Sequence, residues 1–184
     1  MHGLEVSTAL GQFTVRLFTD RAPVTCRYFI DLCERGGLDD GRVFRILAPL
    51  NDALEMSPHI QVVQLGSAQG LSAPRERIAH ESTRLSSLSH RRWSVSASRF
   101  APGEVYRSFF VCMRDEPVLD FGGTRQDDGL GYAAFGEVID GHDTLLALSA
   151  RAEAQPELHK PIPVHRVRVV SLTTTPTTQG PDLR

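Results

Sequence analysis

Several residue types that can do chemistry are abundant in the chain, but few occur at the spacing of a known reactive motif. His80-Glu81 lacks the second histidine of a zinc-binding helix, and the seven histidines are scattered. Asp127-Asp128-Gly129 resembles part of a calcium-binding loop, although the remaining ligands are missing at the required spacing. There is no glycine-rich phosphate loop and no GxSxG turn around a serine nucleophile. The sequence therefore predicts neither a metal site nor a cofactor.

Arginine is the most prominent of the residue types that could act on a substrate. Lys160 is the only lysine among the 20 basic residues, which leaves nineteen arginines. A guanidinium group stays charged and presents several hydrogen-bond donors in a rigid fork. Arg45 lies inside the apolar segment 43–47. Taken alone, Arg45 is most simply a solvated side chain on a strand.

The segments that must position such residues are mostly short strands, because apolar residues alternate with polar ones along them. Strands are expected in residues 4–18 (two strands), 43–47, 60–65, 93–98, 109–113, 133–139 and 164–172. A helix is expected from Pro23, because Cys26, Phe29 and Cys33 follow the helical spacing. A second, shorter helix is expected over 143–150.

Eight short strands and two helices predict an all-β fold. The expected architecture is a closed eight-stranded antiparallel β-barrel capped by two α-helices, because closure removes exposed strand edges. The chain of 184 residues is long enough for one domain, expected over residues 1–172. Residues 67–92, rich in Ser, Arg and His, are expected to form a long surface excursion. Residues 173–184 are expected to be a disordered tail.

Composition and charge exclude several classes of partner. The formal net charge of −2 lacks the basic excess of a nucleic-acid-binding protein. No apolar run approaches 18 residues, so a membrane-embedded protein is not expected. Cys26 and Cys33 are about two helical turns apart, roughly 10 Å, which is too far for a disulfide. Buried reduced thiols predict a cytoplasmic protein, and a periplasmic location would follow if a signal peptide had been removed.

Several short motifs follow one another along the chain, namely Ala22-Pro23-Val24-Thr25, Val43-Phe44-Arg45-Ile46, Val62-Val63-Gln64, Ser108-Phe109-Phe110-Val111 and Tyr132-Ala133-Ala134-Phe135-Gly136-Glu137-Val138. Their order resembles that of the cyclophilins, a family of peptidyl-prolyl isomerases. The resemblance spans residues 4–172 in unbroken order and is strongest toward a divergent bacterial branch. It implies the same closed barrel, peptidyl-prolyl cis-trans isomerase activity that assists protein folding, and Pro-containing polypeptides as partners of a monomeric protein.

The resemblance also implies a role for individual residues. Rotation of an Xaa-Pro amide passes through a twisted state about 18–20 kcal/mol above the planar one, in which the prolyl nitrogen regains a lone pair. By resemblance, Arg45 donates a hydrogen bond to that nitrogen, and Gln64 holds the substrate backbone and positions Arg45. Phe110 matches the floor of the proline pocket, with Val62 and Leu119 as walls. The other residues implied to bind substrate are Gln61, Ser98, Arg99, Ser108 and Tyr132.

Several positions depart from the better-known members of the family. Ser108 stands where a glutamine is common, Gln61 where a phenylalanine is common, and Arg99 where an asparagine is common. Val118 replaces a tryptophan, and Tyr132 stands where many members carry a histidine. Most of these changes remove pocket surface or a hydrogen bond. The alternative is therefore a catalytically weak or inactive module that binds Pro-containing segments.

Overall fold

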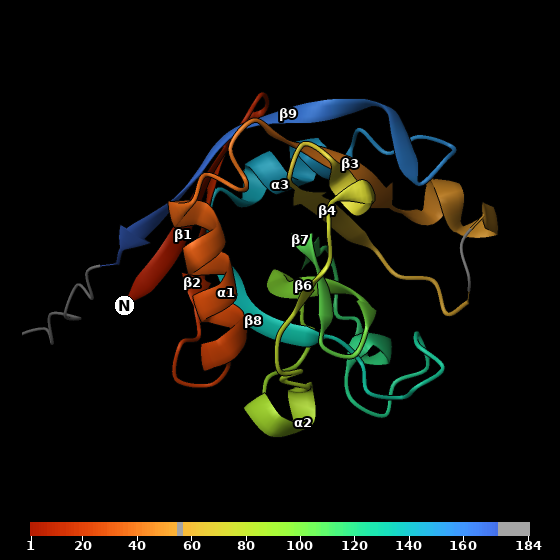
Figure 1. The fold of residues 1–184 in the computed structure, drawn as a ribbon. Coiled ribbons are helices and arrows are strands. Elements are labelled where there is room, and N and C mark those ends of the chain that lie inside the picture. Colours follow the sequence, from red (N-terminus) through yellow and green to blue (C-terminus); the bar gives the residue numbers. More distant parts are fainter. Residues whose placement is uncertain (55–56, 173–184) are drawn as a thin grey trace, which may run out of the picture.

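A computed structural model describes residues 1–54 and 57–172. The predicted tail, residues 173–184, lies outside the described residues. The strands form one antiparallel sheet of nine among the described residues, and eight of them form a closed barrel. Figure 1 shows how these strands are arranged. In sheet order the eight barrel strands are β4 (Val62–Gly66), β3 (Gly41–Leu47), β9 (Glu157–Ser171), β1 (His2–Thr8), β2 (Gly11–Leu17), β8 (Ala133–Asp140), β6 (Ser94–Ala101) and β7 (Glu104–Cys112). Pairing of β4 with β7 closes the barrel, so the predicted architecture is confirmed.

Alternating apolar residues place the core inside the barrel. Leu4 and Val6 on β1 are buried and pair with Val15 and Phe13 on β2. Strands β4 and β7 carry apolar residues on both faces. Odd-numbered residues such as Phe109 join the barrel core, and even-numbered ones form a smaller second cluster outside it. This second face is where a cavity forms.

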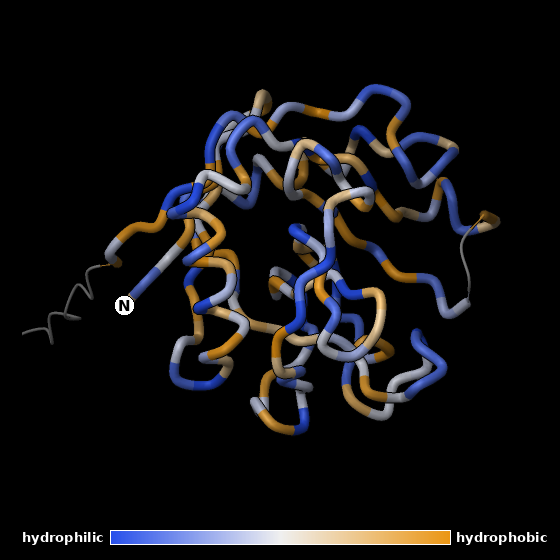
Figure 2. Tube along the Cα trace, in the orientation of Figure 1, coloured by the Kyte–Doolittle hydropathy of each residue, from blue (hydrophilic) through white to orange (hydrophobic). Residues whose placement is uncertain are grey.

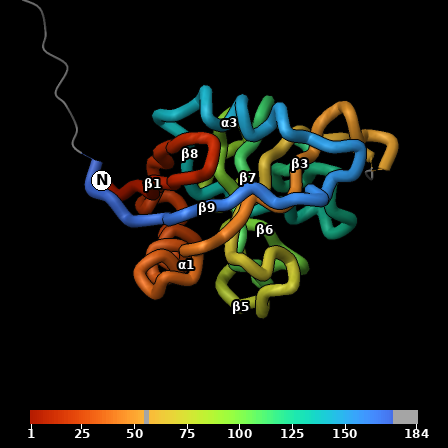
Figure 3. The backbone as a smooth tube through the Cα atoms, turned by 90° about the horizontal axis from the view of Figure 1, so that it is seen from above, coloured from red at the N-terminus to blue at the C-terminus, as the bar shows by residue number. Residues whose placement is uncertain are grey.

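Two helices pack on the barrel, as predicted. Helix α1 (Pro23–Glu34) buries Cys26 and Phe29, and the Phe29 ring stacks on Phe135 with centroids 4.5 Å apart. Helix α3 (His142–Ser149) buries Leu145 and Leu148. Seen from above, the two helices lie on opposite sides of β9 (Figure 3). Burial raises the pKa of the Cys26 thiol to about 12, which agrees with an unreactive buried cysteine.

The excursion over residues 67–92 has more structure than its sequence predicted. It contains a 3-10 turn η2 (Gly70–Ser72), a two-residue strand β5 (Glu76–Arg77) that pairs with β7, and a short helix α2 (Thr83–Ser86). The Glu81 carboxylate accepts hydrogen bonds from the Thr25 N–H (2.8 Å) and hydroxyl (2.7 Å). These contacts fix the excursion to the first turn of α1, where backbone N–H groups lack helical partners. Such long-range contacts leave no local pattern in the sequence.

Strand β9 is also longer than predicted. The sequence predicted this strand only from Val164. Pro161 and Pro163, which precede Val164, cannot donate ladder hydrogen bonds. The structure starts β9 at Glu157 and pairs Pro163 with Arg42 on β3. The carbonyl group of Pro163 accepts a hydrogen bond from the Ala9 N–H (3.0 Å).

Hydrophobic and hydrophilic stretches are interspersed along the described chain (Figure 2). Among the described residues, no helix is long and apolar enough to cross a membrane.

Candidate active site

A cavity of about 380 Å³ lies on the outer face of β3, β4 and β7. The loop between β7 and β8 also contributes to its lining. Seven of the residues predicted from the sequence line this cavity: Arg45, Val62, Gln64, Ser98, Arg99, Phe110 and Tyr132. The other described lining residues are Leu47, Leu54, Ile60, Leu71, Tyr106, Arg125 and Gln126.

Strand register places three of these side chains in one row. Arg45 on β3 pairs with Gln64 on β4, and Gln64 pairs with Phe110 on β7. Directly opposite residues of antiparallel strands point to the same face, with Cβ atoms about 4.5–5.5 Å apart. A guanidinium group, an amide and an aromatic ring therefore lie side by side along the cavity.

The polar half of the cavity is held by hydrogen bonds and an ion pair. Nε2 of Gln64 donates to the hydroxyl groups of Ser98 (3.0 Å) and Ser108 (3.4 Å). Nε of Arg45 lies 3.2 Å from a carboxylate oxygen of Glu157, its pairing partner on β9. These neighbours orient the amide and the guanidinium group before any substrate binds.

The apolar half of the cavity is built around Phe110, of which only 5% is exposed. Its ring meets the Tyr132 ring edge-on, with centroids 5.4 Å apart and an interplanar angle of 86°. Phe110 also belongs to a buried apolar cluster that includes Val62 and Leu119. The result is an apolar floor next to the hydrogen-bonding groups of Arg45 and Gln64.

Arg99 is almost fully buried and uses its donors on the protein itself. Nη1 and Nη2 donate to the two carboxylate oxygens of Asp128 (2.9 and 2.8 Å), and Nε donates to the Gly131 carbonyl group (2.8 Å). The Arg99 hydrogen bond is the main reason that the pKa of Asp128 is lowered. Arg99 therefore fastens the loop that ends at Tyr132 to β6.

The comparison with protein families identifies the chain. Residues 3–174 match the family described as cyclophilin type peptidyl-prolyl cis-trans isomerase/CLD. The chain belongs to the cyclophilin family. It is 27% identical to peptidyl-prolyl cis-trans isomerase B of Escherichia coli (strain K12), over 89% of this chain and 93% of that protein. It is 24% identical to peptidyl-prolyl cis-trans isomerase-like 3 of Rhizopus delemar, over 92% and 93% of the two chains.

Solved cyclophilin structures share the fold. A Cryptosporidium parvum cyclophilin type peptidyl-prolyl cis-trans isomerase, crystallised in the presence of the dipeptide Ala-Pro, superposes with a TM-score of 0.74. It is 20% identical in sequence, and the match covers 92% of this chain and 99% of that one. The family, its isomerase activity and the barrel fold predicted from the sequence are therefore confirmed.

Three residues predicted to bind substrate lie outside the lining of the cyclophilin cavity. Ser108 is completely buried behind Gln64, and its hydroxyl oxygen accepts a hydrogen bond from the Gln64 amide. Leu119 is completely buried in the cluster below Phe110. Gln61 is half-buried, and its backbone N–H donates to the Glu116 carboxylate (2.6 Å). Ser108 and Leu119 are therefore not accessible from the cavity, whereas Gln61 is partly exposed beside it.

Other lining residues were missed by the sequence analysis. Arg125, which is almost fully buried, donates from Nη1 to the Pro58 carbonyl group (3.0 Å). Nε2 of Gln126 donates to the Tyr132 hydroxyl group. Both residues lie in the glycine-rich segment 120–131. Apolar residues do not recur there at regular intervals, so the sequence does not predict which way its side chains point. The available signal is that a long loop in a compact domain is often functional.

Proposed function

We propose that the protein catalyses cis-trans isomerisation of Xaa-Pro bonds in the cavity lined by Arg45, Gln64 and Phe110. One observation carries the proposal, namely the row of guanidinium, amide and ring across three neighbouring strands. This row borders one cavity, whose lining combines apolar side chains such as Leu47 and Ile60 with hydrogen-bonding groups.

The reaction needs no nucleophile. An Xaa-Pro amide loses its resonance as it twists, and the prolyl nitrogen becomes a hydrogen-bond acceptor. The Arg45 guanidinium donates to that nitrogen and stabilises the twisted state more than the planar one, which lowers the barrier. The proline ring rests on Phe110, because an apolar ring is favoured on a buried aromatic surface.

Gln64 holds the substrate backbone next to Arg45. Its Nε2 group donates to Ser98 and Ser108, so its amide oxygen remains the acceptor for an N–H group of the peptide. The same serines fix the amide, which keeps the acceptor in place while the prolyl bond turns. Gln64 thereby separates the part of the substrate that is held from the part that rotates.

The substrates are Pro-containing polypeptides. This assignment is supported by the structural relative that was crystallised in the presence of Ala-Pro. Assistance to protein folding, a monomeric state and a cytoplasmic location are further parts of the proposal. The alternative of a module without catalysis relied on Ser108, Gln61 and Arg99. Ser108 and Gln61 do not line the cavity, and Arg99 is engaged by Asp128, so these departures leave the row of Arg45, Gln64 and Phe110 intact.

The proposal is tested by a protease-coupled isomerisation assay on an Ala-Ala-Pro-Phe peptide. The wild-type protein should accelerate the cis-to-trans step in proportion to its concentration. Arg45→Ala should lower kcat/KM by about two to four decades, the scale of losing one preorganised donor. Arg42 lies on the same strand outside the cavity lining, so Arg42→Ala is the matched control and should keep full activity. An Arg45→Ala variant with wild-type activity would contradict the proposal.

A further inference from the structure

We propose that His90 is a positioning residue of the proline pocket, which holds Phe110 and the loop after Asp120 in place for substrate binding. The proposal rests on the function proposed above. His90 lies between α2 and β6 and is not among the residues that line the cavity. It must therefore act through its neighbours.

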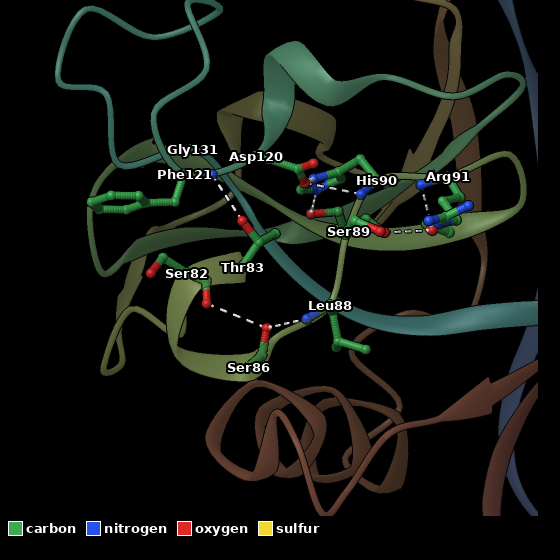
Figure 4. A network of polar contacts seen from close by, with 12 residues as sticks. Ser82, Thr83, Ser86, Leu88, Ser89, His90, Arg91, Asp120, Phe121 and Gly131 are labelled. Atoms are coloured by element: carbon green, nitrogen blue, oxygen red, sulfur yellow. Dashed lines mark hydrogen bonds and ion pairs between the residues drawn. The ribbon is translucent and has the colours of Figure 1, made fainter.

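Both ring nitrogens of His90 have partners. Nδ1 lies 2.7 Å from Oδ1 of Asp120, and Nε2 lies 2.9 Å from the Ser96 hydroxyl oxygen. The His90 backbone N–H donates to the same oxygen of Asp120 (2.9 Å), as Figure 4 shows. An N–H at Nδ1 donates to the carboxylate, and the Ser96 hydroxyl group pairs with Nε2, so both ring contacts are satisfied. With only 1% of the residue exposed, the ring is held in one orientation.

The fixed imidazole supports the floor of the pocket. The His90 and Phe110 rings are nearly parallel, at 18°, with centroids 6.2 Å apart. Phe110 in turn meets Tyr132 edge-on, so three rings follow one another from the interior to the cavity lining. Close-packed interiors leave a side chain little room, and loss of the imidazole would remove packing from one side of Phe110.

His90 also contacts Asp120, at the base of a loop that lines the cavity. Asp120 stands at the start of the loop that supplies lining residues from β7 to β8. The loop closes on itself where the Tyr132 N–H donates to the Leu119 carbonyl group (2.9 Å), next to Asp120. The Asp120 carboxylate thus fastens the base of this loop to His90. One residue connects the floor of the pocket with its wall.

The order Asp120–His90–Ser96 is also the order found around an activated serine nucleophile. A nucleophile must come within about 3–3.5 Å of the substrate atom that it attacks. Ser96 is 0% exposed and lies in the sheet between its pairing partners Phe110 and Ala134. A substrate cannot reach it there. The hydrogen bonds therefore orient the imidazole and do not activate the serine.

Two substitutions separate the contributions of the ring and of its hydrogen bonds. His90→Asn removes the ring and keeps a short amide on the Asp120 side, whereas His90→Phe keeps a ring and loses both hydrogen bonds. The matched control is His142→Asn. His142 also contacts an aromatic ring, Trp93 (4.8 Å), and its Nε2 bonds to the Val138 carbonyl group, but none of these residues lines the cavity.

We expect His90→Asn to raise KM for an Ala-Ala-Pro-Phe peptide about 3- to 10-fold, the scale of one lost aromatic contact. Its kcat should change by less than about threefold, because the groups that act on the amide are untouched. His90→Phe should recover part of the KM rise. His142→Asn should lower the free energy of unfolding in urea and leave KM unchanged. A purely structural His90 would behave like His142.

An unchanged KM in both His90 variants, or an equal rise in His142→Asn, would overturn the proposal. If His90→Asn does not fold, Asp120→Asn takes its place, because it keeps the side-chain shape and weakens the same contact. Asp120→Asn should raise KM in the same direction, and an unchanged value would overturn the proposal. An inactive wild-type protein would count against the proposed function alone. The Kd of the peptide for each variant, from an NMR titration, would then test His90 by the same fold-changes.

Discussion

Arg45 and Gln64 reach the cavity with side chains that their neighbours already hold. Glu157 lies 3.2 Å from Nε of Arg45, and Ser98 accepts from Gln64 at 3.0 Å. A donor that is oriented before the substrate binds needs no reorganisation while the amide twists, and this preorganisation is a large source of electrostatic catalysis. At the scale of single residues, the orientation of the guanidinium matters as much as its charge.

A substitution that keeps the charge tests this view. Arg45→Lys should recover little of the activity lost in Arg45→Ala and should stay about 100-fold or more below wild type in kcat/KM. The reason is that an ammonium group is a point charge without the planar fork of donors. The protease-coupled assay measures both variants, with circular dichroism to verify folding. A lysine variant close to wild type would show that charge alone is sufficient.

Arg99 makes part of the folding stability depend on pH. Its hydrogen bonds lower the pKa of Asp128 from the usual 3.8, so the folded state favours the carboxylate. This contribution is present above about pH 4 and is lost as the pH falls through the lowered pKa. The Arg99→Gln variant lacks this contribution. Its free energy of unfolding in urea should therefore be lower than that of the wild type, and this difference should shrink below about pH 4. A difference that stays constant down to about pH 2.5 would contradict this account.

At the scale of elements, the excursion over residues 67–92 is fixed to the barrel at several points. Glu81 accepts from the first turn of α1, and Nε of Arg21 donates to the Ser86 carbonyl group (2.9 Å). Nε2 of His80 donates to the Leu130 carbonyl group (3.2 Å), which connects the excursion to the loop of the cavity. The excursion therefore supports both α1 and the site.

The Glu81 contact is the most specific of these. Helix α1 has no side-chain cap of its own, and Pro23 at its first turn has no N–H group to donate. Glu81→Gln keeps the shape but loses the charge opposite Val24 and Thr25, so it should lower the free energy of unfolding by about 1–2 kcal/mol. Glu34→Gln, at the exposed end of α1, is the control and should change it by less than about 0.5 kcal/mol. Equal effects of the two substitutions in urea would contradict the capping role.

At the scale of the whole molecule, alternation of apolar residues was enough to predict the barrel. The alternation predicts two strands with one buried face each, carrying Leu4 and Val6 on one strand and Phe13 and Val15 on the other. The structure pairs these strands and buries all four residues. The pairing of Arg45 with Gln64 could not be derived in the same way. Register in β3 shifts between Val43 and Arg45, and a shift of one residue turns a side chain to the other face. The family resemblance supplied what local pattern could not.

The parts that the sequence missed are those fixed by contacts between distant segments. Arg125 enters the cavity from a loop without periodicity, and Ser108 is hidden behind Gln64 by the close pairing of β4 and β7. His90 lies in a segment that reads as polar surface, yet Asp120 and Ser96 allow its burial. Polar residues can be buried when every polar atom has a partner, and those partners are 6 and 30 residues away in the sequence.

The central claim, that Arg45 drives rotation of an Xaa-Pro bond in this cavity, is tested most directly by two-dimensional NMR exchange spectroscopy. An Ala-Ala-Pro-Phe peptide is observed with a substoichiometric amount of protein. Isomerisation without a catalyst is too slow to give cross-peaks, so any cross-peak reports catalysis. Wild-type protein and Arg42→Ala should both produce exchange cross-peaks between the cis and trans forms, and Arg45→Ala should produce none. Peptide signals that shift with wild-type protein but show no exchange, or equal exchange with Arg45→Ala, would contradict the account.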